Sequence, residues 1–177
     1  MKRSEMIGFI QNLNAREASQ VLNNLLSDNH DLTKKAYEIA KKVATDLDVD
    51  AIMDEVFFEL DNIDLDDMNG RAGRTRHGYV EPSEAAWEIF EEALNPFIDE
   101  MKKNQQRKLP SAAKAYCIGI IKGLRKYEET SSSDFKEWVT DAPGEFVYSV
   151  IGDWEEGNPS DDDIAEVMIV AEGDDQG

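Results

Sequence analysis

The chain has 177 residues, of which 41% are hydrophobic and 32% charged, and 38 acidic against 19 basic residues give it a formal net charge of −19. This composition is typical of a folded globular chain and argues against disorder throughout. Because so acidic a chain repels polyanions, we expect no direct binding to nucleic acid or to an anionic membrane surface. The length suits one domain.

Cysteine usage and apolar segments narrow the class of protein further. Cys117 is the only cysteine, which excludes an internal disulfide and a zinc site built from several thiolates. No segment approaches the roughly 18 consecutive apolar residues of a membrane-spanning helix. The apolar stretch after Glu5 is too short and mixed for a signal peptide. We therefore expect a cytoplasmic protein.

The first third of the chain shows helical spacing of apolar residues throughout. Residues 6–13 predict a short opening helix, and Asn14 with Glu17 three positions later has the spacing of a capping box for the next one. Asp31 is expected to cap a third helix, and Asp48 or Asp50 a fourth. Because the intervening turns are very short, antiparallel neighbours are favoured.

Residues 61–81 interrupt this periodicity. The segment holds three glycines and no sustained helical spacing, so we interpret it as the longest irregular loop of the chain. It divides the expected single helical domain, residues 1–177, into the halves 1–62 and 81–171.

Two long helices are predicted after this loop. Pro82 suits the first turn of a helix, and Asn95–Pro96 should kink or restart that helix. Pro110 opens the most apolar helix, which carries Gly119 and Gly123 four positions apart. Small residues at this interval let a second helix approach closely, so we place this helix at the centre of the fold.

The C-terminal part is less regular. Residues 145–151 suit a strand as well as a helix, and we favour a helix because Pro143 can start one and no partner strand is evident. Ser160 is expected to cap a last helix, and residues 172–177 should form a frayed tail. Trp154, followed by two glutamates, is the tryptophan that we expect to be exposed.

Together these elements predict an all-α fold of about eight helices. The consecutive segments LTKKAYEIAKKVATDL and DVDAIMDEVFFELDNI resemble the antiparallel hairpins of armadillo or HEAT-type helical repeats, and NGRAGRTRHGYVEPSEAAWEIFEEALNPF resembles small bacterial helical proteins without an assigned activity. The resemblance implies a scaffold that binds partners along a groove. The 61–81 loop and the C-terminal part depart from a solenoid, so an irregular helical bundle is the alternative.

A basic cluster inside loop 61–81 is the leading candidate site. Arg71, Arg74, Arg76 and His77 lie among glycines that allow close approach to a ligand, and arginine forks match phosphate or carboxylate groups. The start of the following helix would add a favourable dipole. Alternatively, these arginines only pin the loop by pairing with nearby acids: Asp61, Asp64, Asp66, Asp67, Glu81 or Glu84.

Basic and acidic residues are also separated into blocks along the sequence. Residues 101–127 contain eight basic residues and no acid, and residues 137–177 contain thirteen acids and no Lys or Arg. The basic block is either a surface for a polyanionic partner or a surface covered by the acidic helices 82–100 and 137–177. Pairing with those helices is the interpretation that we favour.

Other catalytic or metal-binding patterns are not supported. The run DNIDLDDMNG fails as a calcium loop, because Gly70 at the sixth position places Leu65 first and Arg76 last. Cys117 lies in an apolar stretch and reads as a core thiol. No nucleophile motif accompanies the two histidines, His30 and His77. We therefore expect no catalytic residue, metal or cofactor.

Three functions are compatible with these features. The leading hypothesis is a non-catalytic interaction module that uses the arginine cluster to bind an acidic or phosphate-bearing group of a protein partner. The first alternative is an acidic regulator whose C-terminal block mimics a polyanion and occupies a basic partner. The second alternative is an enzyme on a phosphorylated small molecule, with the arginines as an anion clamp and His77 as acid or base.

Overall fold

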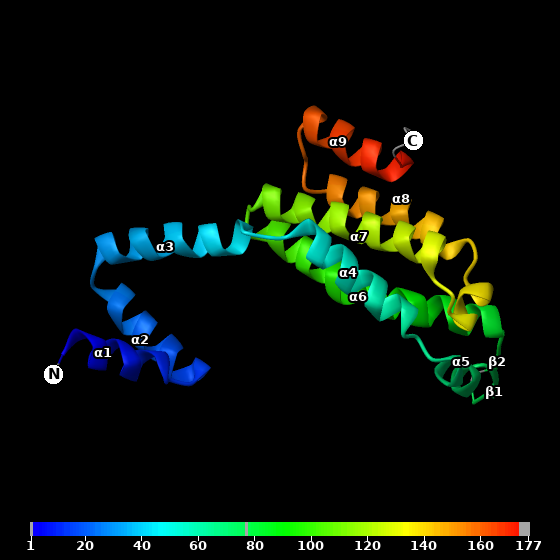
Figure 1. The fold of residues 1–177 in the computed structure, drawn as a ribbon, viewed down its shortest axis with the longest axis horizontal. Coiled ribbons are helices and arrows are strands. Elements are labelled where there is room, and N and C mark those ends of the chain that lie inside the picture. The colour runs from blue at the N-terminus through cyan, green and yellow to red at the C-terminus, as the bar shows by residue number, and fades with distance from the viewer. Residues whose placement is uncertain (1, 77, 174–177) are drawn as a thin grey trace. The chain divides into compact units, whose positions relative to one another are not determined.

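The computed structural model describes residues 2–76 and 78–173. Within these two ranges the fold is all-α, as predicted, with nine α helices, one 3-10 helix and one two-stranded hairpin (Figure 1). The elements in chain order are α1 (Arg3–Gln11), α2 (Ala15–Ser27), α3 (His30–Thr45), α4 (Val49–Asp61), α5 (Leu65–Arg71), β1 (Gly73–Thr75), β2 (Gly78–Val80), α6 (Pro82–Gln106), α7 (Pro110–Thr130), the 3-10 helix η1 (Asp134–Trp138), α8 (Ala142–Glu155) and α9 (Asp161–Glu172).

The chain divides into two compact units, Met1–Ala44 and Thr45–Gly177, which we call the N-terminal unit and the body. The boundary lies in the last turn of α3, well before the 61–81 segment at which we placed the division between halves. The hydrophobic core explains this position, because the buried core residues begin at Ile52 and all of them belong to the body.

The N-terminal unit contains α1, α2 and almost all of α3. Its second helix begins at the predicted capping box, in which Asn14 Oδ1 accepts from the Glu17 backbone N–H at 3.0 Å and the Glu17 carboxylate accepts from the Asn14 backbone N–H at 3.0 Å. The prediction that Asp31 caps the third helix was wrong, because the helix begins at His30 and Asp31 lies in its first turn. Asn29 takes the capping role, since its Oδ1 accepts from the Leu32 backbone N–H at 3.0 Å. None of the described side chains of this unit is buried.

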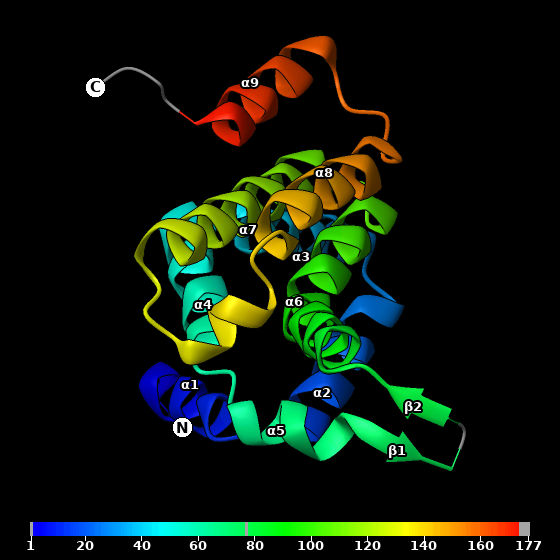
Figure 2. The same cartoon turned by 90° about the vertical axis from the view of Figure 1, so that its right-hand side faces the viewer.

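The body is built around α7, as the small-residue spacing predicted. Helices α4, α6, α8 and α9 all pack against it, so that α7 is covered along most of its length (Figure 2). A Cβ added at Gly119 would lie 2.5 Å from a methyl carbon of Ile52, and one added at Gly123 would lie 2.6 Å from Val56. Glycine at these two positions therefore sets the distance between α7 and α4.

An aromatic cluster fills the core between α6, α7 and α8. The Phe90 ring lies 5.5 Å from Tyr127 in an edge-on arrangement and 5.6 Å from Phe146, measured between centroids. Trp87 stacks on Phe146 at 5.2 Å. Such aromatic pairs contribute about 0.5–1.5 kcal/mol each beyond the apolar area that they bury.

The 61–81 segment is more ordered than we predicted. Asp64 caps the short helix α5 by accepting from the Asp66 backbone N–H at 2.9 Å, and Met68 anchors that helix in the core. A β-hairpin then follows, in which Gly73 begins β1 and Gly78 begins β2. The φ angles of these two glycines, 101° and 140°, exclude most other residues. The expectation of an irregular loop was therefore wrong, because caps and one buried methionine outweigh the missing periodicity.

Three other features of the body bear on the predictions. Residues 145–151 are helical within α8, as favoured, whereas α6 runs through Pro96 without restarting. Leu94 and Ile98, on either side of that proline, are both buried, so packing holds the helix together. The expected exposure of Trp154 was wrong, because it continues the buried face of α8 and is only 3% exposed. Of the expected frayed tail, Glu172 ends α9 and residues 174–177 lie outside the described residues.

Candidate anion-binding hairpin

The arginine cluster predicted from the sequence is distributed over α5 and the β1–β2 hairpin. In the hairpin Gly73 pairs with Val80, Arg74 with Tyr79 and Thr75 with Gly78. This register places the side chains of Arg74 and Tyr79 opposite each other on one face, because directly paired residues of an antiparallel ladder point to the same side. The hairpin thus presents a cation and an aromatic ring side by side.

Arg71 does not take part in this face. Its Nη1 and Nη2 donate to Glu92 Oε1 and Oε2 of α6, each at 2.8 Å, in a two-pronged ion pair. This hydrogen bonding raises the pKa of Arg71 and lowers that of Glu92. Since both side chains remain exposed, the pair contributes little to stability, but it fastens the start of the hairpin to α6.

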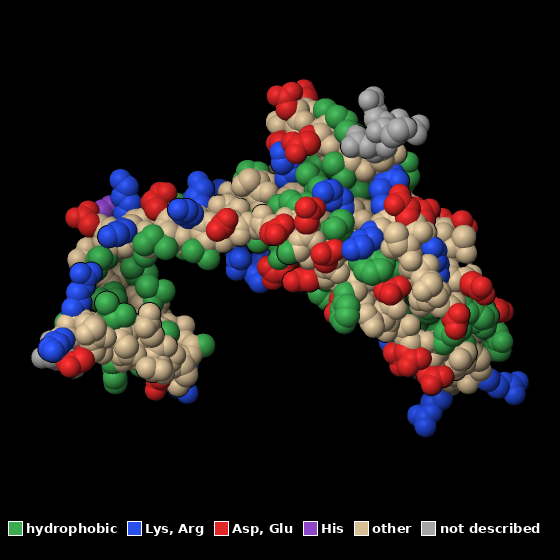
Figure 3. All heavy atoms as spheres, in the orientation of Figure 1, with side chains coloured by type: hydrophobic (Ala, Val, Ile, Leu, Met, Phe, Trp, Pro, Cys, Tyr) green, Lys and Arg blue, Asp and Glu red, His purple; other side chains and the backbone are tan. Residues whose placement is uncertain are grey.

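Arg74 and Arg76 are exposed, and within residues 2–76 and 78–173 neither makes an ion pair. Figure 3 shows basic side chains projecting from the end of the body at which β1 and β2 lie. The fourth predicted site residue, His77, lies outside the described residues. The structure therefore separates the cluster into one arginine that fastens the segment and two that face solvent.

The start of α6 does not strengthen the anion site. The helix begins at Pro82, as predicted, but Glu81 occupies the N-cap position and Glu84 lies in the first turn. Carboxylates at these positions already interact favourably with the helix dipole. The negative charge of these carboxylates would repel an anionic ligand. The residues that could contact such a ligand are therefore those of the hairpin alone.

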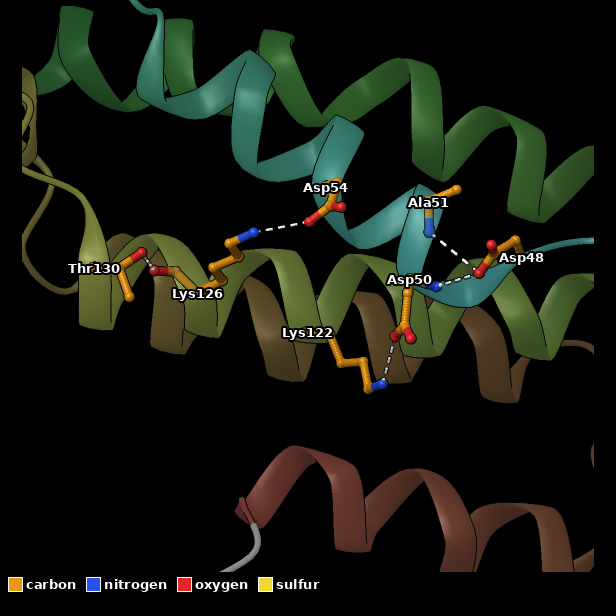
Figure 4. Close-up of polar contacts among 7 residues, drawn as sticks. All are labelled: Asp48, Asp50, Ala51, Asp54, Lys122, Lys126 and Thr130. Carbon is orange, nitrogen blue, oxygen red and sulfur yellow. Dashed lines mark hydrogen bonds and ion pairs between the residues drawn. The ribbon is translucent and has the colours of Figure 1, made fainter.

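The basic block on α7 is largely paired with acids, as we favoured. Lys114 Nζ lies 2.7 Å from Asp163 and 2.8 Å from Glu166 of α9, both in the predicted acidic C-terminal block. Lys122 and Lys126 instead pair with α4, through Asp50 at 2.9 Å and Asp54 at 2.8 Å (Figure 4). Periodicity did not indicate α4 as a cover, because only the tertiary fold places it against α7.

Arg125 belongs to this predicted basic block, but sequence reasoning did not indicate that part of its side chain is buried. The Nε atom of Arg125 is buried and has no hydrogen-bond partner among the described residues. Arg125 lines a cavity of about 350 Å³ between α4, α7 and α9, together with Lys122 and Lys126. Lys122 and Lys126 are already held by aspartates of α4, which lowers the positive charge available to a ligand there. Nothing in the local sequence distinguishes Arg125 from its neighbours.

The acidic C-terminal block is partly neutralised. Hydrogen bonds from Lys114 and Ser160 lower the pKa of Asp163, and Glu166 shares the same lysine. Asp161 and Asp162 remain exposed in the first turn of α9. A polyanion-mimicking surface would therefore depend on fewer carboxylates than the sequence contains.

Two kinds of catalytic group can be examined in the described part of the chain, the Cys117 thiol and a metal-binding cluster. Burial raises the pKa of Cys117 to about 12, so the thiol is not a nucleophile near neutral pH. Among residues 2–76 and 78–173, no group of three or more His, Cys, Asp or Glu side chains is placed to hold a metal ion. No helix in these ranges combines the length and apolar character needed to cross a membrane.

Comparison of the chain with protein-family models, with curated proteins and with solved structures gave no match. The resemblance to helical repeats thus stays a prediction, and function rests on the geometry described above.

Proposed function

We propose that this chain is a non-catalytic, cytoplasmic protein-interaction module whose β1–β2 hairpin binds an acidic or phosphate-bearing group of a protein partner. The observation that carries the proposal is the pair of exposed guanidinium groups, Arg74 and Arg76, on a hairpin fastened at its base by Arg71 and Glu92. A fastened hairpin loses less conformational entropy on binding than a mobile loop does.

The chemistry of the hairpin fits an anionic group on a larger partner. Arginine forks bind carboxylate and phosphate oxygens two at a time, and the exposed ring of Tyr79 opposite Arg74 adds apolar contact area. Among the described residues, those of the hairpin do not line any of the four recesses of about 350–390 Å³ found on the body, so a small molecule would be poorly enclosed. A peptide segment, which gains area along its length, suits such a surface better.

The first experiment is an NMR titration of the full chain with two probes: an Asp/Glu-rich peptide and the same peptide carrying phosphoserine. We expect amide shifts in residues 73–80 with at least one probe, and weaker binding at high salt because exposed charges are screened. The comparison between probes distinguishes carboxylate from phosphate as the preferred group.

The variant Arg74→Ala/Arg76→Ala should weaken binding at least about tenfold, as expected for loss of two charge-assisted contacts. A matched control, Arg107→Gln/Lys108→Asn, removes two exposed charges elsewhere on the body, and asparagine tolerates the positive φ of 57° at position 108. This control should bind as the wild type does. Equal binding by the hairpin variant, or shifts confined to the Arg125 cavity, would refute the hairpin as the site.

A further inference from the structure

The N-terminal unit exposes large apolar side chains on all three of its helices. Phe9 is 71% exposed and Val43 is 69% exposed, and no described residue of the unit is buried. Isolated surface apolar residues are ordinary, but a concentration of them marks an interaction surface. The exposed set consists of Met6, Ile7, Phe9, Ile10, Val21, Leu22, Leu25, Leu32, Tyr37, Ile39 and Val43.

The spacing of these residues is that of helix–helix packing. On α3 the apolar positions 32, 36, 39 and 43 follow one another at intervals of four, three and four, the spacing of a seam between two helices. On α2, Ala18, Leu22 and Leu25 repeat the pattern. Side chains of α1 and α2 also surround an apolar recess of about 200 Å³. The surface is therefore shaped to receive another apolar helix.

The unit lacks the means to be stable in isolation. Ordering a residue costs roughly 1–2 kcal/mol of backbone entropy, and burial of apolar side chains is the main term that offsets this cost. The body buries a continuous core, whereas the N-terminal unit contributes no residue to that core. Chains of about 40 residues usually need an oligomer, a metal or disulfides to fold. Residues 1–44 contain no cysteine, so of these means of stabilisation we favour an oligomer.

From these observations we propose that the N-terminal unit is a homodimerisation element, in which α1–α3 of two copies pack their apolar faces together. A large apolar side chain presents roughly 150–200 Å² when fully exposed, so eleven of them at about half exposure offer on the order of 900 Å². A standard interface takes about 800 Å² from each partner. The available surface thus matches one copy of a dimer.

Charge favours a second copy over a partner of strong charge. Residues 1–44 hold seven basic and five acidic residues, whereas the rest of the chain holds twelve basic and thirty-three acidic ones. Two N-terminal units therefore approach each other with little repulsion, while two bodies repel. A two-fold interface also needs only one self-complementary patch, which the identical apolar seams of the two copies supply.

The test is the molar mass of the full chain measured by light scattering after size exclusion and by sedimentation equilibrium over a range of concentrations. We expect twice the 20.0 kDa of one chain. The dissociation constant of the dimer should not rise at high salt, because the contact is apolar. Leu22→Asp/Leu25→Asp should raise the dimer dissociation constant at least roughly 100-fold by placing charges in an apolar interface.

A matched control, Tyr148→Asp/Ile169→Asp, introduces the same charges at two exposed apolar positions of the body, and it should remain dimeric. All three tryptophans, Trp87, Trp138 and Trp154, belong to the body. Their near-UV circular dichroism therefore shows whether a variant still folds there, even if α1–α3 lose helicity with the dimer.

Three results would overturn the proposal. The first is a wild-type chain that is monomeric at every concentration, whether its N-terminal amides exchange freely or are protected by docking on its own body. The second is a Leu22→Asp/Leu25→Asp variant that stays dimeric. The third is a control variant that becomes monomeric, which would place the interface on the body.

Discussion

Replacement of Gly123 by alanine probes the contact on which the body depends. In a helix, alanine is favoured over glycine by about 1 kcal/mol, so a change at an open position should stabilise the protein. At Gly123, however, the new methyl carbon would lie 2.6 Å from both Val56 Cβ and Val56 Cγ1 and 3.0 Å from the Met53 carbonyl oxygen. Carbon atoms pack best at about 3.5–4.0 Å.

The clash cannot be relieved by a side-chain rotation. Val56 Cβ is fixed to its backbone and the Met53 oxygen is backbone itself, so α4 as a whole must move away from α7. Overpacking of this kind costs about 1–3 kcal/mol or more, and loss of the Lys122 and Lys126 ion pairs to α4 adds to it. After subtraction of the helix preference, we expect Gly123→Ala to lower the free energy of unfolding by up to about 2 kcal/mol.

Urea denaturation followed by tryptophan fluorescence measures this difference. The matched control is Gly152→Ala in α8, at which an added Cβ has no heavy atom within 4 Å, and it should raise the free energy of unfolding by up to about 1 kcal/mol. If Gly123→Ala proves as stable as Gly152→Ala, the close approach of α4 and α7 is not present in the protein and the reasoning fails.

Two further predictions concern single groups. Because hydrogen bonds lower the pKa of Asp163 below its ordinary 3.8, the contribution of this carboxylate to the attachment of α9 should be fully present above that pH and be lost as the pH falls through the lower folded-state pKa. Lys114→Met should weaken this acid dependence and speed amide exchange in α9, and unchanged exchange would contradict it. Cys117, buried and with a pKa raised to about 12, should resist a thiol reagent at pH 8 in the native protein and react on unfolding; fast native labelling would show that α7 is not central.

Much of the secondary structure follows from local sequence. The capping box at Asn14, the helix start at Pro82 and the helical character of residues 145–151 were predicted, because caps and periodicity act within a few residues. The close approach of a second helix to α7 at Gly119 and Gly123 was predicted as well, since only glycine lacks a Cβ. The hairpin was missed, although two glycines close to the β-forming residues Thr75, Tyr79 and Val80 were a usable signal.

The partners of charged and aromatic side chains were decided by the tertiary structure. The sequence showed blocks of opposite sign, but Arg71 pairs with Glu92 and Lys126 with Asp54, more than 20 residues away in each case. Trp154 is buried because its helix face turns toward the core, which flanking glutamates do not reveal. Helix formation depends on neighbours a few residues apart, so sequence determines it. Charge pairing, burial and the lack of a core in the N-terminal unit depend on which helices meet, and only folding settles that.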